Sequence, residues 1–372
     1  MENIGRKIKT MRKRLNLSQE DLAKRVNSSW HRQTLGDIEN NKRELKAWEL
    51  AKIATALGVE LSDFLHPKAI KKSAICWRNK PENFQELEVK FIKKCQYYQT
   101  LEDLLHINRE SNKFPSYKLN LEEFSLSEAY KLGEEIRRKL RLGEYPSYCL
   151  FRELEERYNV KFIFESLGSQ KCAAFCCSDE YGIGILLNGN EAPWYRHFSL
   201  AHELFHIVTW SKELSSQIDN NLRLREKNEE FADAFAASLL IPRETLAEMV
   251  SKFTRKNGFC SAVLVAIARQ FGVSIEALAR RMGSLKIIDE KVLKKILNNS
   301  QVLSLDRTQM VNNHLPYTSR FVELAFIAYE KGEISRSKLA QILSVPLSGL
   351  KKRLKEHGYG ELNNDKIPIN NT

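Results

Sequence analysis

The chain of 372 residues exceeds the size of one ordinary domain, so we expect several domains. Its 42% hydrophobic and 28% charged residues are typical of a globular protein, and no apolar run reaches the roughly 18 residues that span a membrane. The N-terminal sequence MENIGRKIKTMRKRLNLSQ has no apolar stretch after its charges, which argues against a secretory signal and favours a cytoplasmic protein.

Positive charge gathers at the two ends of the chain. Residues 1–72 hold 16 lysines and arginines against 9 acidic residues, and residues 289–372 hold 13 against 9. Residues 73–288 are nearly neutral, with 30 against 29. A basic end favours a polyanionic partner such as DNA.

The first 66 residues carry the pattern of five short helices. Ile4, Ile8 and Met11 recur at helical spacing, and Ser18 is placed to cap a second helix. A third helix follows NSSW, a fourth, WELAKIATALGV, ends at Gly58, and LSDFL forms the fifth.

This order of helices resembles the lambda-repressor-like (XRE) helix-turn-helix family along residues 4–65. The matching residues are Leu17 to Glu20, Leu22 and Ala23, Leu35, Ile38 to Asn40, and Leu50 to Gly58. In that family the third helix lies in the major groove of DNA. The resemblance implies base contacts from Arg32, Gln33, Thr34 and Asp37, and phosphate contacts from Gln19, Asn41, Lys42 and Arg43. Two extra residues in the turn before Leu35 depart from the family pattern and could shift these contacts by one residue.

Residues 67–125 are predicted to form a helical connector. A helix that we expect Ser127 to cap begins at SEAYKLGEEIRRKLRLG and stops at Gly143. Three later runs, VKFIFESL, KCAAFCCS and GIGILLN, are typical of strands. With no export signal, disulfides are not expected, and Cys172, Cys176 and Cys177 are better explained as small residues of a buried strand than as a metal or redox site.

The sequence HFSLAHELFHIVTW, residues 197–210, places two histidines four residues apart. On a helix His202 and His206 share a face and can both bind one ion, while Glu203 lies beside it. Two imidazole ligands and a carboxylate that takes a proton from water are what a zinc hydrolase needs.

A tetrahedral zinc site of this kind needs a third protein ligand. The downstream run EKNEEFADAFAASLLIP, residues 226–242, has helical periodicity and places Glu229 and Asp233 on one face. We expect Glu229 to bind zinc and Asp233 to hold a ligand histidine by its other ring nitrogen. Glu226 and Glu230 are rival third ligands, and the alternative is a solvated acidic face.

These two helices resemble the ImmA/IrrE family of zinc metallopeptidases, over about residues 127–288. The matching residues are Arg196, Phe198, Leu200 to Leu204, His206, Glu229, Ala232, Asp233, Phe235 to Ala237, Leu239, Leu240 and Pro242. The resemblance implies a gluzincin-like endopeptidase that uses Zn²⁺, with Glu203 as the proton acceptor. Phe205 replaces the usual glycine and is expected to tighten the space around the metal, and His197 replaces the usual phenylalanine.

Substrate contacts are less defined by the sequence. The strand YGIGILLN is expected to pair with an extended substrate at a sheet edge. The donor that stabilises the oxyanion stays open among Tyr181, Tyr195 and His197.

The C-terminal 84 residues read as helices. Ser335 is expected to cap SKLAQILSV, and Pro346 to begin a new turn. The run ISRSKLAQILSVPLSGLKKRLKE has the look of a second helix-turn-helix, but the weak net charge favours a packing module. The tail NNDKIPINNT is expected to be disordered.

Together these patterns predict a mostly helical α+β protein with four parts. They are a helix-turn-helix domain (1–66), a helical connector (67–125), a zincin-like domain with a small sheet (126–288) and a helical module (289–372). The predicted function is a DNA-binding transcriptional regulator whose zinc endopeptidase cleaves itself or a partner regulator. Its expected partners are an operator duplex, a peptide substrate and a second copy of the chain. In one alternative the zincin-like domain senses a ligand or partner without catalysis, and in another the N-terminal helices dock on protein.

Overall fold

The computed structural model describes residues 4–359 with gaps at 16, 28, 60, 62–63, 65–74, 79, 108–112, 168–172, 212–213, 215–217, 219–220, 258–259 and 306–317. The chain divides into two compact units. One comprises Met1–Ile75 and Lys80–Tyr97, and the other comprises Cys76–Asn79 and Tyr98–Thr372. The predicted fifth helix lies partly, and the C-terminal tail wholly, outside the described residues.

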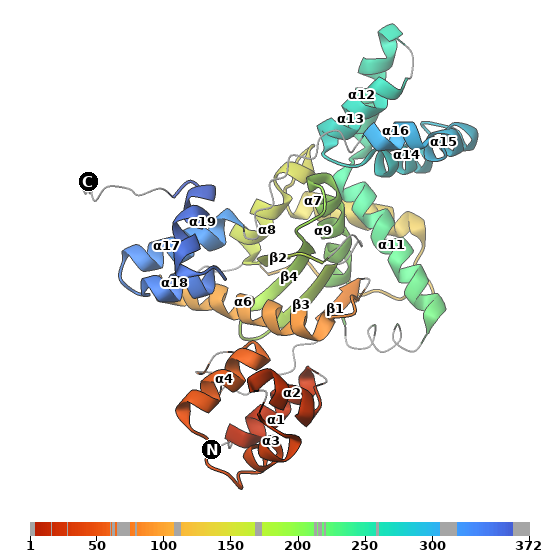
Figure 1. The fold of residues 1–372 in the computed structure, drawn as a ribbon. Coiled ribbons are helices and arrows are strands. Elements are labelled where there is room, and N and C mark those ends of the chain that lie inside the picture. Colours follow the sequence, from red (N-terminus) through yellow and green to blue (C-terminus); the bar gives the residue numbers. More distant parts are fainter. Residues whose placement is uncertain are drawn as a thin grey trace, which may run out of the picture. The chain divides into compact units, whose positions relative to one another are not determined.

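The first unit contains the first four of the five helices predicted for the N-terminal stretch. They are α1 (Ile4–Arg14), α2 (Gln19–Val26), α3 (Arg32–Glu39) and α4 (Ala47–Leu57), drawn in red and orange in Figure 1. Ser18 caps α2 in a capping box with Asp21, and Gly58 ends α4 in the left-handed conformation. The apolar positions of the four helices, among them Leu22 and Leu35, meet in one core.

A buried polar network fixes α1, α2 and α3 to one another. Arg12 Nη2 donates to Glu39 Oε2 at 2.9 Å, and Gln19 Nε2 donates to the same oxygen at 2.9 Å. Glu39 is 3% exposed, so these donors replace the water that would otherwise solvate its carboxylate. The network orients the start of α2 relative to α3.

The second unit is built on a four-stranded sheet in the order β1-β3-β4-β2. Its strands are β1 (Ile75–Arg78), β2 (Lys161–Glu165), β3 (Ala173–Ser178) and β4 (Gly182–Asn188). β4 runs parallel to β2 and antiparallel to β3, and Ile185 of β4 lies opposite Phe162 and Phe175. The three predicted strand runs are present, whereas β1 lies in a segment predicted as helical connector.

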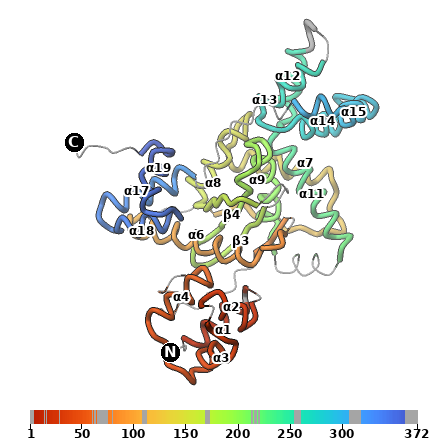
Figure 2. The backbone as a smooth tube through the Cα atoms, viewed as in Figure 1, coloured from red at the N-terminus to blue at the C-terminus, as the bar shows by residue number. Residues whose placement is uncertain are grey.

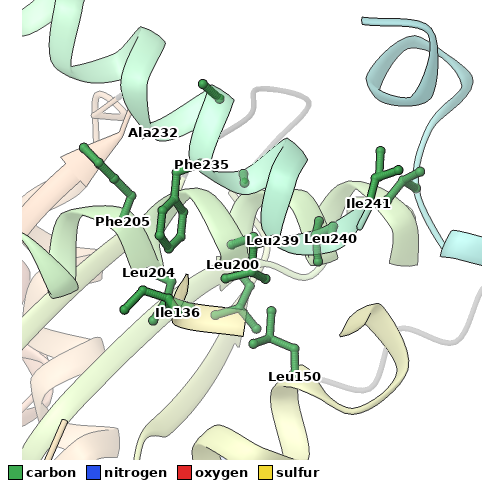
Figure 3. Packing of buried hydrophobic residues seen from close by; sticks show 14 of the residues in the cluster. Ile136, Leu150, Leu200, Leu204, Phe205, Ala232, Phe235, Leu239, Leu240 and Ile241 are labelled. Carbon is green, nitrogen blue, oxygen red and sulfur yellow. The ribbon is translucent and has the colours of Figure 1, made fainter. Parts of the chain in front are cut away.

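Helices cover this sheet and complete the second unit. α9 (Pro193–Val208) packs against β3 and β4, and α11 (Leu222–Leu240) packs against both α9 and α7 (Leu126–Lys139), as Figure 1 shows. The apolar residues of these elements form one continuous core, part of which Figure 3 shows between α9 and α11. Ser125 caps α7, since its hydroxyl accepts from the Glu128 amide, so the predicted cap at Ser127 is wrong by two residues.

The remaining helices follow in chain order, and Figure 2 traces their course. They are α6 (Phe84–Leu104), η1 (Pro146–Tyr148), α8 (Leu150–Tyr158), α12 (Arg243–Asn257), α13 (Ser261–Phe271), α14 (Ile275–Ser284), α15 (Glu290–Leu297), α16 (Ser300–Ser304), α17 (Ser319–Glu330), α18 (Arg336–Ile342), η3 (Leu347–Gly349) and α19 (Leu350–Glu356). α15 and α16 pack against α14, which Arg281 fixes to Glu134 of α7 at 3.0 Å. Ser335 caps α18, as the sequence predicts.

In the described part of the chain, no single helix has the length and apolarity of a membrane span. Taken together, the consecutive helices α13 and α14 are long and apolar enough for a span, but the chain bends by 97° between them. Residues of both helices, including Ile267 and Leu278, lie in the core of the second unit.

Candidate metal centre

Two helices of the second unit bring the histidines and one acid together. His202 and His206 lie one turn apart on α9, and Glu229 reaches them from α11. His206 Nε2 is 3.2 Å from His202 Nε2, while Glu229 lies 3.2 Å from the His202 ring nitrogen and 3.5 Å from that of His206. In the described ranges, this trio is the group of side chains that could hold a metal ion.

The separations between the two imidazole nitrogens and the Glu229 carboxylate are close to those of a tetrahedral zinc site. Zn–N and Zn–O bonds of 2.0–2.1 Å in a tetrahedron place neighbouring ligand atoms about 3.3–3.4 Å apart. The two imidazole nitrogens are 3.2 Å apart, Glu229 Oε2 lies 3.2 Å from His202 Nε2, and the other carboxylate oxygen, Oε1, lies 3.5 Å from His206 Nε2, so these separations are close to that value. The rival acids Glu226 and Glu230 are exposed and are not part of this group, so the rotation of α11 selects Glu229.

Asp233, one turn after Glu229, holds the far side of the first histidine. Its Oδ1 lies 2.8 Å from His202 Nδ1, which leaves His202 Nε2 directed at Glu229 and His206. This is the arrangement that fixes the orientation and tautomer of a metal-binding imidazole. Asp233 is 54% exposed, whereas the imidazole that it orients is fully buried.

Asn228 contacts the Nδ1 atom of His206, as Asp233 contacts that of His202, and no motif in the sequence predicted it. Its Nδ2 lies 3.2 Å from His206 Nδ1, while its Oδ1 is the one end of this buried amide without a partner among the described residues. A metal on His206 Nε2 would place a proton on Nδ1, and turning the amide by 180° would supply Oδ1 as the acceptor. Its place next to Glu229 in α11 was the available signal.

Glu203 lies beside the ligands and is buried. Within the described residues its Oε1 has no hydrogen-bond partner, and the carboxyl is 1% exposed. Burial raises the pKa of Glu203 to about 7. A buried carboxyl with an unoccupied oxygen and a pKa near neutrality suits a group that accepts and returns a proton.

The other pKa values show where positive charge is favoured. Burial opposes a charge on His202, but hydrogen bonds with Asp233 and Glu229 outweigh it and raise its pKa. Burial and the neighbouring His202 lower the pKa of His206 to about 3. For Glu229, burial is outweighed by the histidines, and its pKa falls to about 2. The centre therefore combines a neutral imidazole, an ionised carboxylate and a position where one cation is stabilised.

Arg78 reaches the same centre from β1, and no sequence motif pointed to it. Its Nη2 lies 3.4 Å from Asp233 Oδ1, and 155 residues separate the two in the chain. The positive charge of Arg78 contributes to lowering the pKa of Asp233 and of Glu229. The hydrogen bond with His202 lowers these two pKa values more than Arg78 does, and Arg78 adds to that effect.

Three other expectations are corrected or refined by the structure. β4, YGIGILLN in the sequence, lies between β3 and β2, so it has no free edge for a substrate, and the edges are β1 and β2. Phe205 packs against Phe235 in the core, with ring centres 5.5 Å apart, and so fills the space between α9 and α11 (Figure 3). His197 Nδ1 bonds the Gly272 carbonyl at 2.9 Å, and Tyr181 is buried, so both are engaged in packing.

The cysteine cluster is only partly described. Cys172 lies outside the described residues, Cys176 is buried in β3 and Cys177 is exposed at the end of the same strand. Neither described cysteine belongs to the group that could hold a metal ion.

The residues expected to face DNA lie along α3 and in the loop after it, except Gln19, which begins α2. Arg32 and Gln33 are exposed, whereas Thr34 and Asp37 are half-buried. The three predicted residues of the loop after α3 are all exposed, namely Asn41, Lys42 and Arg43. Arg43 lies 2.6 Å from Glu49, and Gln19 is held by Glu39, so these two side chains are positioned by acids of their own unit.

Comparison with known proteins identifies the two domains. The chain carries a DNA-binding helix-turn-helix domain followed by a domain of a metallopeptidase family. Residues 8–64 match the helix-turn-helix family, and residues 155–282 match the IrrE N-terminal-like domain of the M78 peptidase family. No curated protein matches the chain.

Two solved structures of regulators match the chain at low sequence identity and low TM-score. A Mycobacterium tuberculosis transcriptional regulator matches with 15% identity and a TM-score of 0.31, covering 50% of this chain and 51% of its own. The present chain thus spans about half the length of that structure. Bacillus thuringiensis PlcR, in complex with the peptide PapR7 and DNA, matches with 13% identity and a TM-score of 0.18, covering 98% of this chain and 100% of its own.

Proposed function

We propose that the chain is a DNA-binding transcriptional regulator whose IrrE-like domain is a zinc-dependent endopeptidase, which cleaves the regulator itself or a partner regulator. The observation that carries this proposal is the convergence of two imidazoles and one carboxylate, at separations of 3.2 to 3.5 Å, beside the buried carboxyl of Glu203. His202, His206 and Glu229 would hold the zinc ion. When bound, zinc supplies a Lewis acid that acidifies water and polarises a carbonyl oxygen.

The protein groups around the ligands then perform the proton transfers of amide hydrolysis. Glu203 accepts a proton from the attacking water through the oxygen that has no partner among the described residues. The water oxygen bonds to the carbonyl carbon, the C–N bond breaks, and Glu203 returns the proton to the leaving nitrogen. Asp233 and Asn228 keep the two imidazoles aligned throughout.

The N-terminal domain supplies the second half of the proposed function. The exposed start of α3, with Arg32 and Gln33, would read base edges, since arginine fits guanine and glutamine fits adenine. Asn41, Lys42 and Arg43 lie in the loop after α3 and would contact phosphates. DNA binding of this kind weakens steeply as salt rises.

The test combines metal content with cleavage. The purified full chain is expected to contain one zinc ion per molecule, and incubation with zinc is expected to yield a fragment detected by intact mass. Glu203→Gln should retain zinc and abolish the fragment, because it removes the proton acceptor and leaves the ligands intact. Glu230→Gln, an equal change of charge at an exposed position of α11, should cleave normally.

The outcomes separate the proposal from its alternative. A chain that binds no zinc would contradict the metal centre. A chain that binds zinc but cleaves neither itself nor a co-purified regulator would favour the sensor function, in which the centre binds a ligand or partner without catalysis.

A further inference from the structure

The C-terminal helices form a second helix-turn-helix group. α17, α18 and α19 gather around a small apolar centre, coloured blue in Figures 1 and 2. Phe321, Leu339, Leu343 and Leu350, from all three helices and the turn between α18 and α19, are each at most 2% exposed. The group therefore has a packed interior, and its polar side chains are left on the outside.

The connection between α18 and α19 has the geometry of a helix-turn-helix motif. α18 ends at Ile342, four residues from Leu343 to Pro346 make the turn, and η3 leads directly into α19. Ser344 adopts a φ of 51°, and the Val345 amide bonds back to the Ala340 carbonyl at 3.0 Å. A turn of three or four residues between two helices is typical of this motif.

The start of α17 docks the group on the rest of the second unit. Arg320 Nη2 lies 2.6 Å from Glu102 Oε1, and Arg320 Nη1 donates to the Tyr98 hydroxyl at 2.9 Å. The ring of Phe321 packs on that of Tyr98 with centres 5.1 Å apart. Because these contacts come from α17, docking does not consume the outer sides of α18 and α19.

The outer side of α18 and α19 is basic. Residues 336–356 hold six lysines and arginines and one acidic residue, Glu356, which is paired with Arg353 at 3.2 Å. The basic residues exposed to solvent are Arg336, Lys351, Lys352 and Lys355. Leu347, 51% exposed, and Ser348, also exposed, lie in η3 directly before α19. They add an apolar side chain and a hydroxyl group to the same surface.

We propose that α18 and α19 form a second motif that binds double-stranded DNA. α19 would lie along the major groove, where Lys351, Lys352 and Lys355 would contact the phosphates at its edges, and Arg336 at the start of α18 would contact a further phosphate. Leu347 would be placed to contact a thymine methyl group. The net charge of residues 289–372 is small because most of their acidic residues lie outside α18 and α19. For this reason the net charge alone favoured a packing module.

A second DNA-binding motif on the same chain has a specific consequence. Two DNA-binding surfaces joined in one molecule raise the effective concentration of each for a nearby site once the other has bound. The chain could then bind two adjacent sites without dimerising. This proposal is independent of the peptidase activity, because it rests on residues 319–356 alone.

The test measures the binding of the full chain to a fluorescein-labelled duplex of mixed sequence as a function of salt. The triple variant Lys351→Ala, Lys352→Ala and Lys355→Ala removes three exposed charges from α19. The matched control replaces Lys291, Lys294 and Lys295, three exposed lysines of α15, by alanine. Each lost phosphate contact lowers the slope of log affinity against log salt by about 0.9.

The expected result is a slope reduced by about 2–3 in the α19 variant and unchanged in the α15 variant. Circular dichroism of both variants checks that the fold is kept. Acetylation by a lysine reagent supplies a direct readout, since duplex DNA should slow the modification of Lys352 and leave that of Lys294 unchanged. Equal slopes in the two variants, with no protection of Lys352, would overturn the proposal and leave an acidic protein as the partner of this basic surface.

Discussion

The orientation of His202 by Asp233 can be tested by removing the carboxylate. In Asp233→Ala the 2.8 Å contact with His202 Nδ1 is lost, and the imidazole is free to turn away from the other ligands. Loss of such a partner lowers metal affinity about 10- to 100-fold, or about 1.4–2.7 kcal/mol. Since Asp233 is 54% exposed, solvent screens its charge, and we expect about 10- to 30-fold.

The conservative variant separates charge from geometry. In Asp233→Asn the amide oxygen can still accept from His202 Nδ1, so the orientation is kept and only the negative charge is lost. We therefore expect Asp233→Asn to weaken zinc binding less than Asp233→Ala. Arg78 loses its ionic partner in both variants, so the difference between them isolates the hydrogen bond.

Competition with a chromophoric zinc chelator measures these affinities in the full chain. Glu230→Ala is the control, since it removes an exposed carboxylate of the same helix that makes no contact with the centre. If Asp233→Ala and Glu230→Ala bind zinc equally well, Asp233 does not orient His202 and the proposed role fails.

Three further predictions concern packing, the N-terminal domain and pH. Gly133→Ala should lower the free energy of unfolding of the second unit by about 1–3 kcal/mol, because an added Cβ would overlap Ser238 Oγ of α11; unchanged urea denaturation would contradict this close contact. Glu39→Ala should destabilise the first unit by about 3–5 kcal/mol, because it leaves the buried charge of Arg12 without its carboxylate; calorimetry showing an unshifted transition would refute it. Zinc affinity should fall as pH drops, because the pKa of metal-free His202 lies above its usual 6.5 and imidazolium cannot bind metal. Titration calorimetry in two buffers should therefore detect proton release on zinc binding at about pH 6. An affinity that does not change with pH would exclude this competition between proton and metal.

Local periodicity explains why much of the centre could be predicted. His202, Glu203 and His206 lie within one and a half turns of a single helix, so their relative positions follow from the helical repeat. Ser18, Gly58 and the first four N-terminal helices follow from the same short-range rules. Fold class and the family of each domain were accessible for this reason.

Residues far apart in the sequence could not be placed in the same way. The pattern of α11 allowed Glu226, Glu229 or Glu230 as the third ligand, because a helical repeat fixes which residues share a face but not which face meets α9. In the structure Phe235 packs on Phe205 of α9, and with α11 in this rotation Glu229 lies beside the two histidines. Asn228 then faces His206 as a consequence.

The amino-acid sequence by itself determined the helices, the pair of histidines with its adjacent acid, and the two kinds of domain, since each depends on residues within a few turns of one another. Only the tertiary structure decided which acid of α11 lies beside the two histidines, the pairing of β1 with β3, the approach of Arg78 to Asp233 and the exposed basic side of α19. These features depend on how whole elements pack, and packing energy is summed over many weak contacts between distant residues. No short pattern in the chain encodes that sum.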